Sequence, residues 1–220
     1  MRAHSVPVFR HAAMLAAALL LAAAFAPAAQ ASARGEQFVQ TNVEHGLGIL
    51  NNRSLSESEK RSQFANFLLD LTDMNRIARY TLGQYRRGVP DSEIAAFSNA
   101  FQSYALAVYQ SYFARYGGQT LRVIGSEPGS DSTNEVVRTQ LVDPSDRSGQ
   151  QPAEVDFRVY FEPQGPKVLD FSYGGIWLAE TERNDFTGFL GQNGGDLHAL
   201  DQHLSDLARQ FRQQPGKAPD

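Results

Sequence analysis

Histidine side chains are the first groups in this sequence that could perform metal or acid–base chemistry. The 220-residue chain has no cysteine, and beyond its N-terminal segment the histidines are His45, His198 and His203. His198 and His203 are five residues apart, which places them on different faces of a helix. This spacing does not favour a shared metal ion. We therefore predict no metal site and no cofactor.

Two carboxylates in the second half of the chain could act as an acid–base pair, Asp156 and Asp170. Each lies in the middle of an alternating strand pattern. Alternation places Asp156 opposite the phenylalanines of its strand, so we expect it to face water. It also directs Asp170 away from Leu169 and Phe171, as a salt-bridge or hydrogen-bond partner. No G-x-S-x-G motif is present, and we predict no catalytic residue and no enzymatic activity.

The elements that position these residues follow from hydrophobic periodicity. Helical spacing dominates the first part of the chain and its end, and alternation dominates the middle. Ser56 with Glu59 forms a capping box, and Asp73 is a candidate cap for a short helix. We expect helices over 36–50, from 56, from 73, over 92–116, 182–190 and 196–211. We expect strands over 120–124, 135–142, 154–162 and 167–173.

This order of elements predicts an α+β fold, with helices packed on a curved antiparallel sheet of about four strands. Aromatic residues on the long helix and on the strands would face each other across an apolar space suited to a lipid tail. The predicted cavity wall consists of Phe97, Phe101, Tyr104, Val108, Val137, Leu141, Val155, Phe157, Val159, Phe171 and Trp177.

The N-terminus has the layout of a secretory signal peptide. Basic residues precede an apolar run over 12–26, and two A-x-A patterns end at Ala31 and Ala33. The run is shorter than the roughly 20 residues that span a bilayer. We predict a cleaved signal peptide over 1–33, a single domain over 34–213, a disordered tail over 214–220, and a periplasmic location. A net charge of −4 does not favour nucleic acid as a partner.

The order of short motifs resembles the MlaC, or toluene-tolerance, family of periplasmic phospholipid-binding proteins. The resemblance covers nearly the whole mature chain. The sequence departs from the family pattern at Pro166, at Arg86 and at Trp177. With these departures, it most resembles the hopanoid-biosynthesis-associated (HpnM) branch of the family. The matching residues are Asp73, Ile77-Ala78, Leu82-Gly83, Tyr85-Arg86, Phe97, Phe101, Tyr109, Lys167-Val168-Leu169-Asp170, Gly175-Ile176-Trp177-Leu178, Arg183, Phe186, Leu190, Gly195, Leu197 and Leu200.

The resemblance implies an NTF2-like cone that binds a phospholipid or a hopanoid. It also implies carriage of that lipid between the inner and outer membranes, with handover to membrane-bound transport complexes. By position in the family pattern, Asp170 and Arg183 would pair at the joint between the last strand and the following helix.

Two alternative functions stay open at this point. An NTF2-like enzyme, an isomerase or hydrolase of an apolar substrate, would need a buried carboxylate or a tyrosine pair inside the cone. A structural module that binds a partner protein would have a filled core. A cavity below about 300 Å³, the low end of ligand sites, would favour the second alternative.

Overall fold

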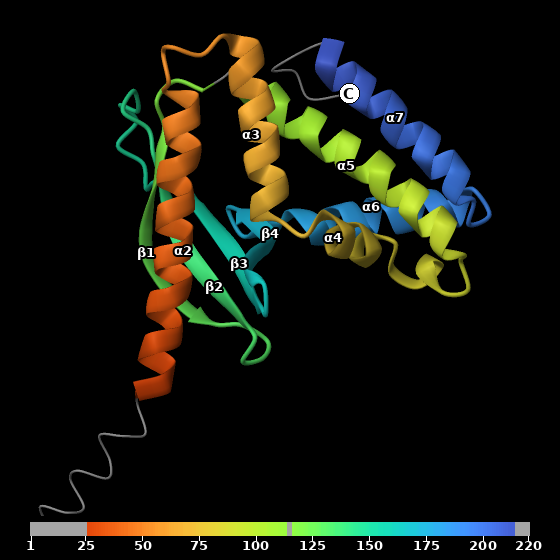
Figure 1. The fold of residues 1–220 in the computed structure, drawn as a ribbon, viewed down its shortest axis with the longest axis horizontal. Helices are drawn as coiled ribbons and strands as arrows, with labels where there is room; N and C mark the ends of the chain where they lie inside the picture. The colour runs from red at the N-terminus through yellow and green to blue at the C-terminus, as the bar shows by residue number, and fades with distance from the viewer. Residues whose placement is uncertain (1–25, 114–115, 214–220) are drawn as a thin grey trace, which may run out of the picture.

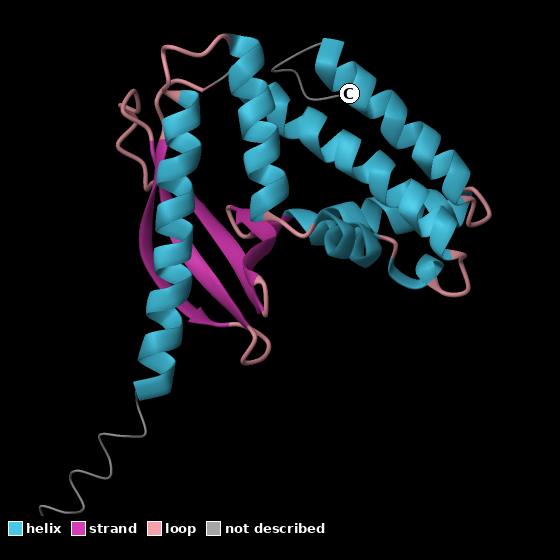
Figure 2. Ribbon diagram, viewed as in Figure 1, coloured by secondary structure: helices cyan, strands magenta, loops and turns pink. Residues whose placement is uncertain are grey.

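The computed structural model describes residues 26–113 and 116–213. The helices are α2 (Ala26–Leu50), α3 (Glu57–Leu71), α4 (Met74–Thr81), the 3₁₀ turn η2 (Gly83–Arg86), α5 (Asp91–Phe113), α6 (Leu178–Gln192) and α7 (Leu197–Gln213). The strands are β1 (Thr120–Pro128), β2 (Asn134–Val142), β3 (Glu154–Glu162), β4 (Gly165–Tyr173) and β5 (Ile176–Trp177). Figure 2 shows the strands gathered at one side of the helices.

The predicted signal peptide lies largely outside the described residues, and the predicted tail over 214–220 lies wholly outside them. The signal cleavage and the proposed domain limits therefore stay predictions. No helix within the described ranges combines the length and the apolar character needed to cross a bilayer.

The sheet is antiparallel throughout and keeps the chain order β1-β2-β3-β4-β5. The predicted α+β fold with helices on an antiparallel sheet is confirmed. The structure has five strands where the alternation predicted about four, because the fifth is a two-residue strand, Ile176–Trp177, at the edge. Two residues are too few to produce a recognisable alternating pattern.

A β-bulge interrupts the pairing of β3 with β4. Arg158 lies opposite Asp170, but the next residue, Val159, lies opposite Val168. Leu169 is therefore the extra residue of β4. Simple alternation placed Val168 on the face opposite Phe171. The structure corrects this expectation, because both residues pair with side chains of the same face of β3, Val159 and Phe157.

Local capping signals set the starts of two helices, as predicted. The Ser56 hydroxyl accepts a hydrogen bond from the Glu59 amide, and the Glu59 carboxylate accepts one from the Ser56 amide at 2.8 Å. At α4, the Asp73 carboxylate accepts a hydrogen bond from the Arg76 amide at 3.0 Å. Both arrangements satisfy backbone N–H groups that a helix start leaves without an intrahelical partner.

The helices form two groups (Figure 1). Helix α2 packs on β1 and β2 of the sheet and α3 packs beside α2, whereas α4, α5, α6 and α7 pack mainly on one another. We call the first assembly the sheet-side group and the second the helical group. Each has a hydrophobic core of its own. The core of the helical group includes Phe97, Leu190, Leu200 and Leu204, all completely buried.

Candidate functional site

A cavity of about 380 Å³ lies in the sheet-side group, between α2, α3 and the sheet. This volume falls within the range of small-molecule sites and above its low end of about 300 Å³. Helix α2 lines it with Phe38, Val39, Asn42, Val43, Gly46, Leu47 and Leu50. Helix α3 contributes Phe64, Phe67, Leu68 and Leu71. The sheet and the segment before it contribute Tyr116, Gln119, Thr120, Leu121, Leu141, Val155, Phe157, Val168 and Tyr173.

The position of the cavity follows from how α2 meets the sheet. Near the middle of the helix, Val39 packs against Val137 and Val159, both completely buried, and it also borders the cavity. Towards the C-terminal end of the helix, Val43, Leu47 and Leu50 line the cavity. Opposite this part of α2, the cavity is lined by α3 as well as by the sheet.

Gly46 allows the rings of α3 to approach α2 closely. A Cβ atom at this position would lie 3.2 Å from Cε1 of Phe67 and 3.4 Å from Cε2 of Phe64. A larger side chain at residue 46 would therefore have to push the rings aside or extend into the cavity. Glycine at this position lets the two rings lie against the backbone of α2, although glycine in a helix is less stable than alanine.

Among the described residues, no charged side chain lines this cavity. Its few polar groups are partly occupied already, since the Asn42 amide donates to the Phe38 carbonyl at 2.8 Å. Such a cavity excludes ions and offers water few hydrogen-bond partners, whereas hydrocarbon loses nothing on entering it. The arrangement suits binding of an apolar chain.

The strand residues predicted for the cavity wall are divided between this cavity and the core. Leu141, Val155 and Phe157 line the cavity. Val137 and Val159 do not line it and are completely buried against Val39 of α2. Alternation along β2 and β3 placed all five on the same face, and the two that pack under Val39 of α2 belong to the core rather than to the cavity wall.

The residues predicted from the long helix lie elsewhere. Phe97 is completely buried in the helical group, and its ring meets that of Phe186 edge to face at 6.2 Å. Phe101, Tyr104, Val108 and Phe171 line a separate cavity of about 40 Å³. Trp177 lies outside both cavities, with the Arg158 guanidinium 4.3 Å from its ring centre. Their role in lipid binding stays a prediction.

The smaller cavity contains a buried carboxyl–tyrosine pair that the sequence reasoning missed. The Tyr104 hydroxyl donates to Oε1 of Glu182 at 2.9 Å. Burial raises the pKa of Glu182 to about 7, although the hydrogen bond from Tyr104 acts in the opposite direction. The cavity holds a few water molecules at most, far below the size of a substrate site. The pair is therefore enclosed rather than presented to a ligand.

The joint between β4 and α6 depends on Asp170, with a different partner from the one expected. Its Oδ1 accepts a hydrogen bond from the Ala179 amide at 2.8 Å and so caps α6 from the neighbouring strand. Its Oδ2 accepts one from Nη1 of Arg158 at 3.4 Å. Arg183, the expected partner, instead places its guanidinium 4.8 Å from the ring centre of Tyr80. Burial raises the pKa of Asp170, and the bond to the Ala179 amide offsets part of that effect.

Asp156 does not point freely into water, as alternation had suggested. The Ser172 hydroxyl donates to its Oδ2 at 3.3 Å, and its buried Oδ1 has no hydrogen-bond partner among the described residues. Burial raises the pKa of Asp156. Asp156 pairs across the sheet with Ser172, which is itself completely buried, so this part of the outer face is not open to water.

Sequence reasoning missed the contribution of α2 and α3 to the larger cavity. Their apolar stripes were visible as helical spacing in the sequence. The additional signal was Gly46, a glycine inside the apolar stripe of a helix, which marks a close approach between elements. Within residues 34–111 and 116–213, no cluster of three or more histidine, aspartate or glutamate side chains could hold a metal ion.

The chain resembles known proteins in sequence and in fold. The sequence matches the family described as "MlaC protein" over residues 40–206. A similar solved structure is that of a phospholipid-binding protein from Ralstonia solanacearum, determined in complex with a phospholipid. It shares 24% sequence identity and a TM-score of 0.68, and the match covers 80% of this chain and 98% of that one. Comparison with curated protein sequences gives no match.

Proposed function

Because the chain belongs to the MlaC protein family, we propose that it is a periplasmic lipid carrier whose cavity between α2, α3 and the sheet holds lipid tails. The observation that carries this proposal is the cavity of about 380 Å³ with an uncharged, largely aliphatic and aromatic lining. The chemistry required of a carrier is only the exclusion of water from hydrocarbon. The proposal requires no bond-making group in this cavity.

The physical driving force is burial of methylene groups. Each methylene transferred from water into an apolar site gains about 0.8 kcal/mol. A tail that buries ten methylenes would gain roughly 8 kcal/mol before the cost of ordering the tail is subtracted. This gain keeps the tail in the cavity rather than in water while the protein is away from a membrane, and it does not depend on any specific polar contact.

We further propose that the cargo is a phospholipid or a hopanoid, carried between the inner and outer membranes. The similar protein from Ralstonia solanacearum was solved with a phospholipid, which supports the first of these cargoes. The hopanoid alternative depends on the departures from the family pattern at Pro166, Arg86 and Trp177. Membrane-bound transport complexes would then load and unload the carrier.

Mass spectrometry of organic extracts from the purified mature protein tests the proposal. We expect one class of lipid at close to one molecule per protein. Protein that is repeatedly empty after gentle purification would contradict lipid carriage and favour the structural-module alternative. A lipid of unexpected class would change the cargo and leave the carrier function in place.

A matched pair of variants tests whether the lipid occupies this cavity. Gly46→Leu would extend a side chain toward the cavity, and we expect it to reduce the lipid content severely. Gly48→Leu makes the same change two residues away on α2, where nothing lies within 4 Å of the added Cβ atom. This control should keep its lipid. Circular dichroism must show that both variants are folded, and equal lipid content in both would place the binding site elsewhere.

The enzyme alternative has one observation in its favour, the buried pair of Tyr104 and Glu182. The cavity that contains the pair is about 40 Å³, which does not admit an apolar substrate. We therefore expect Glu182→Gln to leave lipid content unchanged. Conversion of the extracted lipid by the wild-type protein, lost in Glu182→Gln, would favour an enzyme instead.

A further inference from the structure

A second cleft adjoins the large cavity at the end of α2. It has a volume of about 390 Å³ and shares two wall residues with the large cavity, Leu50 and Tyr116. The remaining lining has the opposite character. Among the described residues, its charged side chains are three cations, Arg53, Lys60 and Arg61, and one acid, Glu57. An uncharged hollow thus borders directly on a cationic one.

The boundary between the two spaces is marked by a polar contact. The Asn51 side-chain amide and the Tyr116 hydroxyl are hydrogen-bonded at 3.1 Å. Tyr116 lines both spaces, whereas Asn51 lines the cationic cleft and not the large cavity. An amphiphile with its tail in the large cavity would place its first polar atoms at this boundary, where the lining changes from apolar to charged.

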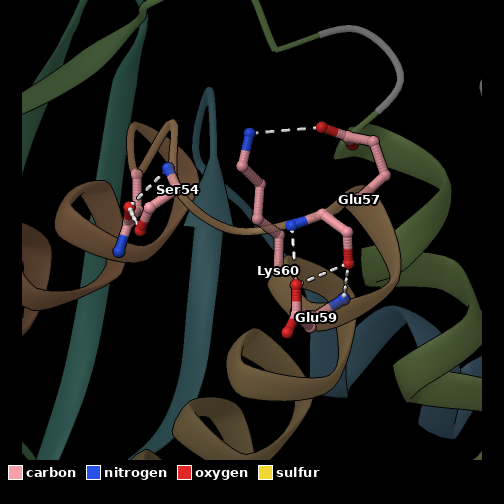
Figure 3. A network of polar contacts seen from close by, with 6 residues as sticks. Ser54, Glu57, Glu59 and Lys60 are labelled. Carbon is pink, nitrogen blue, oxygen red and sulfur yellow. Dashed lines mark hydrogen bonds and ion pairs between the residues drawn. The ribbon is translucent and has the colours of Figure 1, made fainter.

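Two features hold the cleft in shape (Figure 3). The Asn52 side chain accepts hydrogen bonds from the Ser54 amide and hydroxyl at 3.0 and 2.7 Å, which fixes the turn before α3. The capping box of Ser56 and Glu59 fixes the first turn of α3. The loop that carries Arg53 and the helix that carries Arg61 are therefore ordered by contacts that do not use the arginines.

The cations are unequally available to a ligand. The Lys60 ammonium is held by Oε1 of Glu57 at 3.2 Å. Across residues 34–111 and 116–213, no ion pair occupies the guanidinium of Arg53 or of Arg61. Arginine matches the oxygens of a phosphate with its planar set of donors. The charges of Lys60 and Glu57 neutralise each other, which leaves the positive charges of the two arginines for an anionic ligand.

We propose that this cleft is the headgroup subsite of the carrier, with Arg53 and Arg61 binding the phosphate of a phospholipid whose tails lie in the large cavity. The inference depends on the proposed lipid-carrier function and specifies its substrate class. A phosphate at the mouth gains charge-assisted hydrogen bonds from both arginines. A lipid without phosphate, such as a neutral hopanoid, gains nothing there and leaves the two charges in water.

The experiment measures binding of three probes to delipidated protein. These are phosphatidylglycerol, a diacylglycerol with the same tails, and inorganic phosphate. The test variant is Arg53→Gln with Arg61→Gln. The control is Arg86→Gln with Arg87→Gln, which removes the same charge from an exposed turn of the helical group.

We expect the test variant to weaken phosphatidylglycerol binding by about tenfold per arginine, as charge-assisted hydrogen bonds typically do. Diacylglycerol binding should be unchanged, and the control should behave as wild type with every probe. Added salt should weaken phosphatidylglycerol binding in wild type more than in the test variant.

Three results would overturn the subsite. Equal binding of phosphatidylglycerol by wild type and test variant would show that the arginines do not contact the headgroup. Tight binding of inorganic phosphate, lost in the test variant while phosphatidylglycerol binding persists, would identify a site for free phosphate. Equal weakening by the control would reduce the effect to net charge. Failure of wild type to bind either lipid would instead contradict the carrier function itself.

Discussion

The sheet-side group and the helical group use the same kinds of residues and reach opposite outcomes. In the helical group, Phe97, Phe101 and Phe186 meet at ring distances of 6.2 Å and leave a cavity of only about 40 Å³. In the sheet-side group, the side chains of α2, α3 and the sheet leave about 380 Å³ empty. Aromatic content therefore does not determine whether a hollow forms. The geometry of the elements does, because helices of the helical group fit into one another, whereas α2 packs on the sheet at Val39 and borders empty space from there to Leu50.

Truncation of an apolar side chain should lower the free energy of unfolding by very different amounts in the two groups. Leu200 is completely buried in the helical group, and Leu200→Ala should lower the free energy of unfolding by about 2–5 kcal/mol. Leu47 borders space that is already empty, so Leu47→Ala should lower it by about 1 kcal/mol in delipidated protein. Urea unfolding of both variants measures the difference. Equal losses would mean that the sheet-side cavity collapses in solution.

The enclosed carboxyl of the helical group should make that group sensitive to pH. The folded-state pKa of Glu182 is about 7, above its ordinary value of 4.5. The contribution of Glu182 to the free energy of unfolding is fully present below pH 4.5, where the carboxyl is protonated in both states. This contribution is lost as the pH rises toward 7, because the carboxyl of the unfolded chain ionises at lower pH than that of the folded protein. Relative to Glu182→Gln, the wild type should lose about 2–3 kcal/mol between pH 4.5 and 8.

Urea unfolding at several pH values checks this expectation. The control is Glu180→Gln on the exposed face of the same helix, which should follow the wild type. Identical pH profiles for the wild type and Glu182→Gln would mean that water reaches the carboxyl, and the contrast between a closed helical group and an open sheet-side group would weaken.

Loss of the Asp170 cap at the joint between the two groups should lower the free energy of unfolding by a smaller amount. Asp170→Ala removes the acceptor for the Ala179 amide and the partner of Arg158. We expect a loss of about 1–2 kcal/mol, as for other helix caps, and a smaller loss for Asp170→Asn, which keeps an acceptor oxygen. Thermal unfolding of the two variants compares them. A larger loss for asparagine than for alanine would contradict the capping role.

The smallest effect is expected at the mouth of the sheet-side cavity. Glu59→Ala breaks one half of the capping box and should lower the free energy of unfolding by about 0.5–1 kcal/mol. Gln63→Ala, an exposed change later in α3, should have almost no effect. Hydrogen exchange of the amides at the start of α3 would report the loosening directly. Unchanged exchange would show that other contacts order this loop.

Local features were predictable from the sequence, and features created by packing were not. The limits of β3 and the caps at Ser56 and Asp73 agree with the structure, because each depends on neighbouring residues only. The aromatic stripe of α5 was also visible. Periodicity reveals that a helix has an apolar face but not which element covers it. Residues such as Phe97 therefore lie in a helix–helix core rather than beside the large cavity.

The candidate site shows the same division. Leu141, Val155 and Phe157 were predicted from alternation and line the cavity. The opposite wall from α2 and α3 was missed, because the crossing of a helix over a sheet leaves no periodic trace in either segment. The pair of Asp170 with Arg158 was missed for a related reason. The bulge at Leu169 shifts the register between β3 and β4, and no local signal announces it.

That bulge also bears on how sequences of this kind should be aligned. Leu169 has no partner across the ladder, and the residues on either side, Val168 and Asp170, oppose consecutive residues of β3. Loss of this single residue would leave a regular ladder in which every flanking side chain keeps its present face. A one-residue gap here is therefore structurally inexpensive, whereas the same gap elsewhere in the strand would turn the core outward. Spacing across this position should be treated as variable when distant relatives are sought.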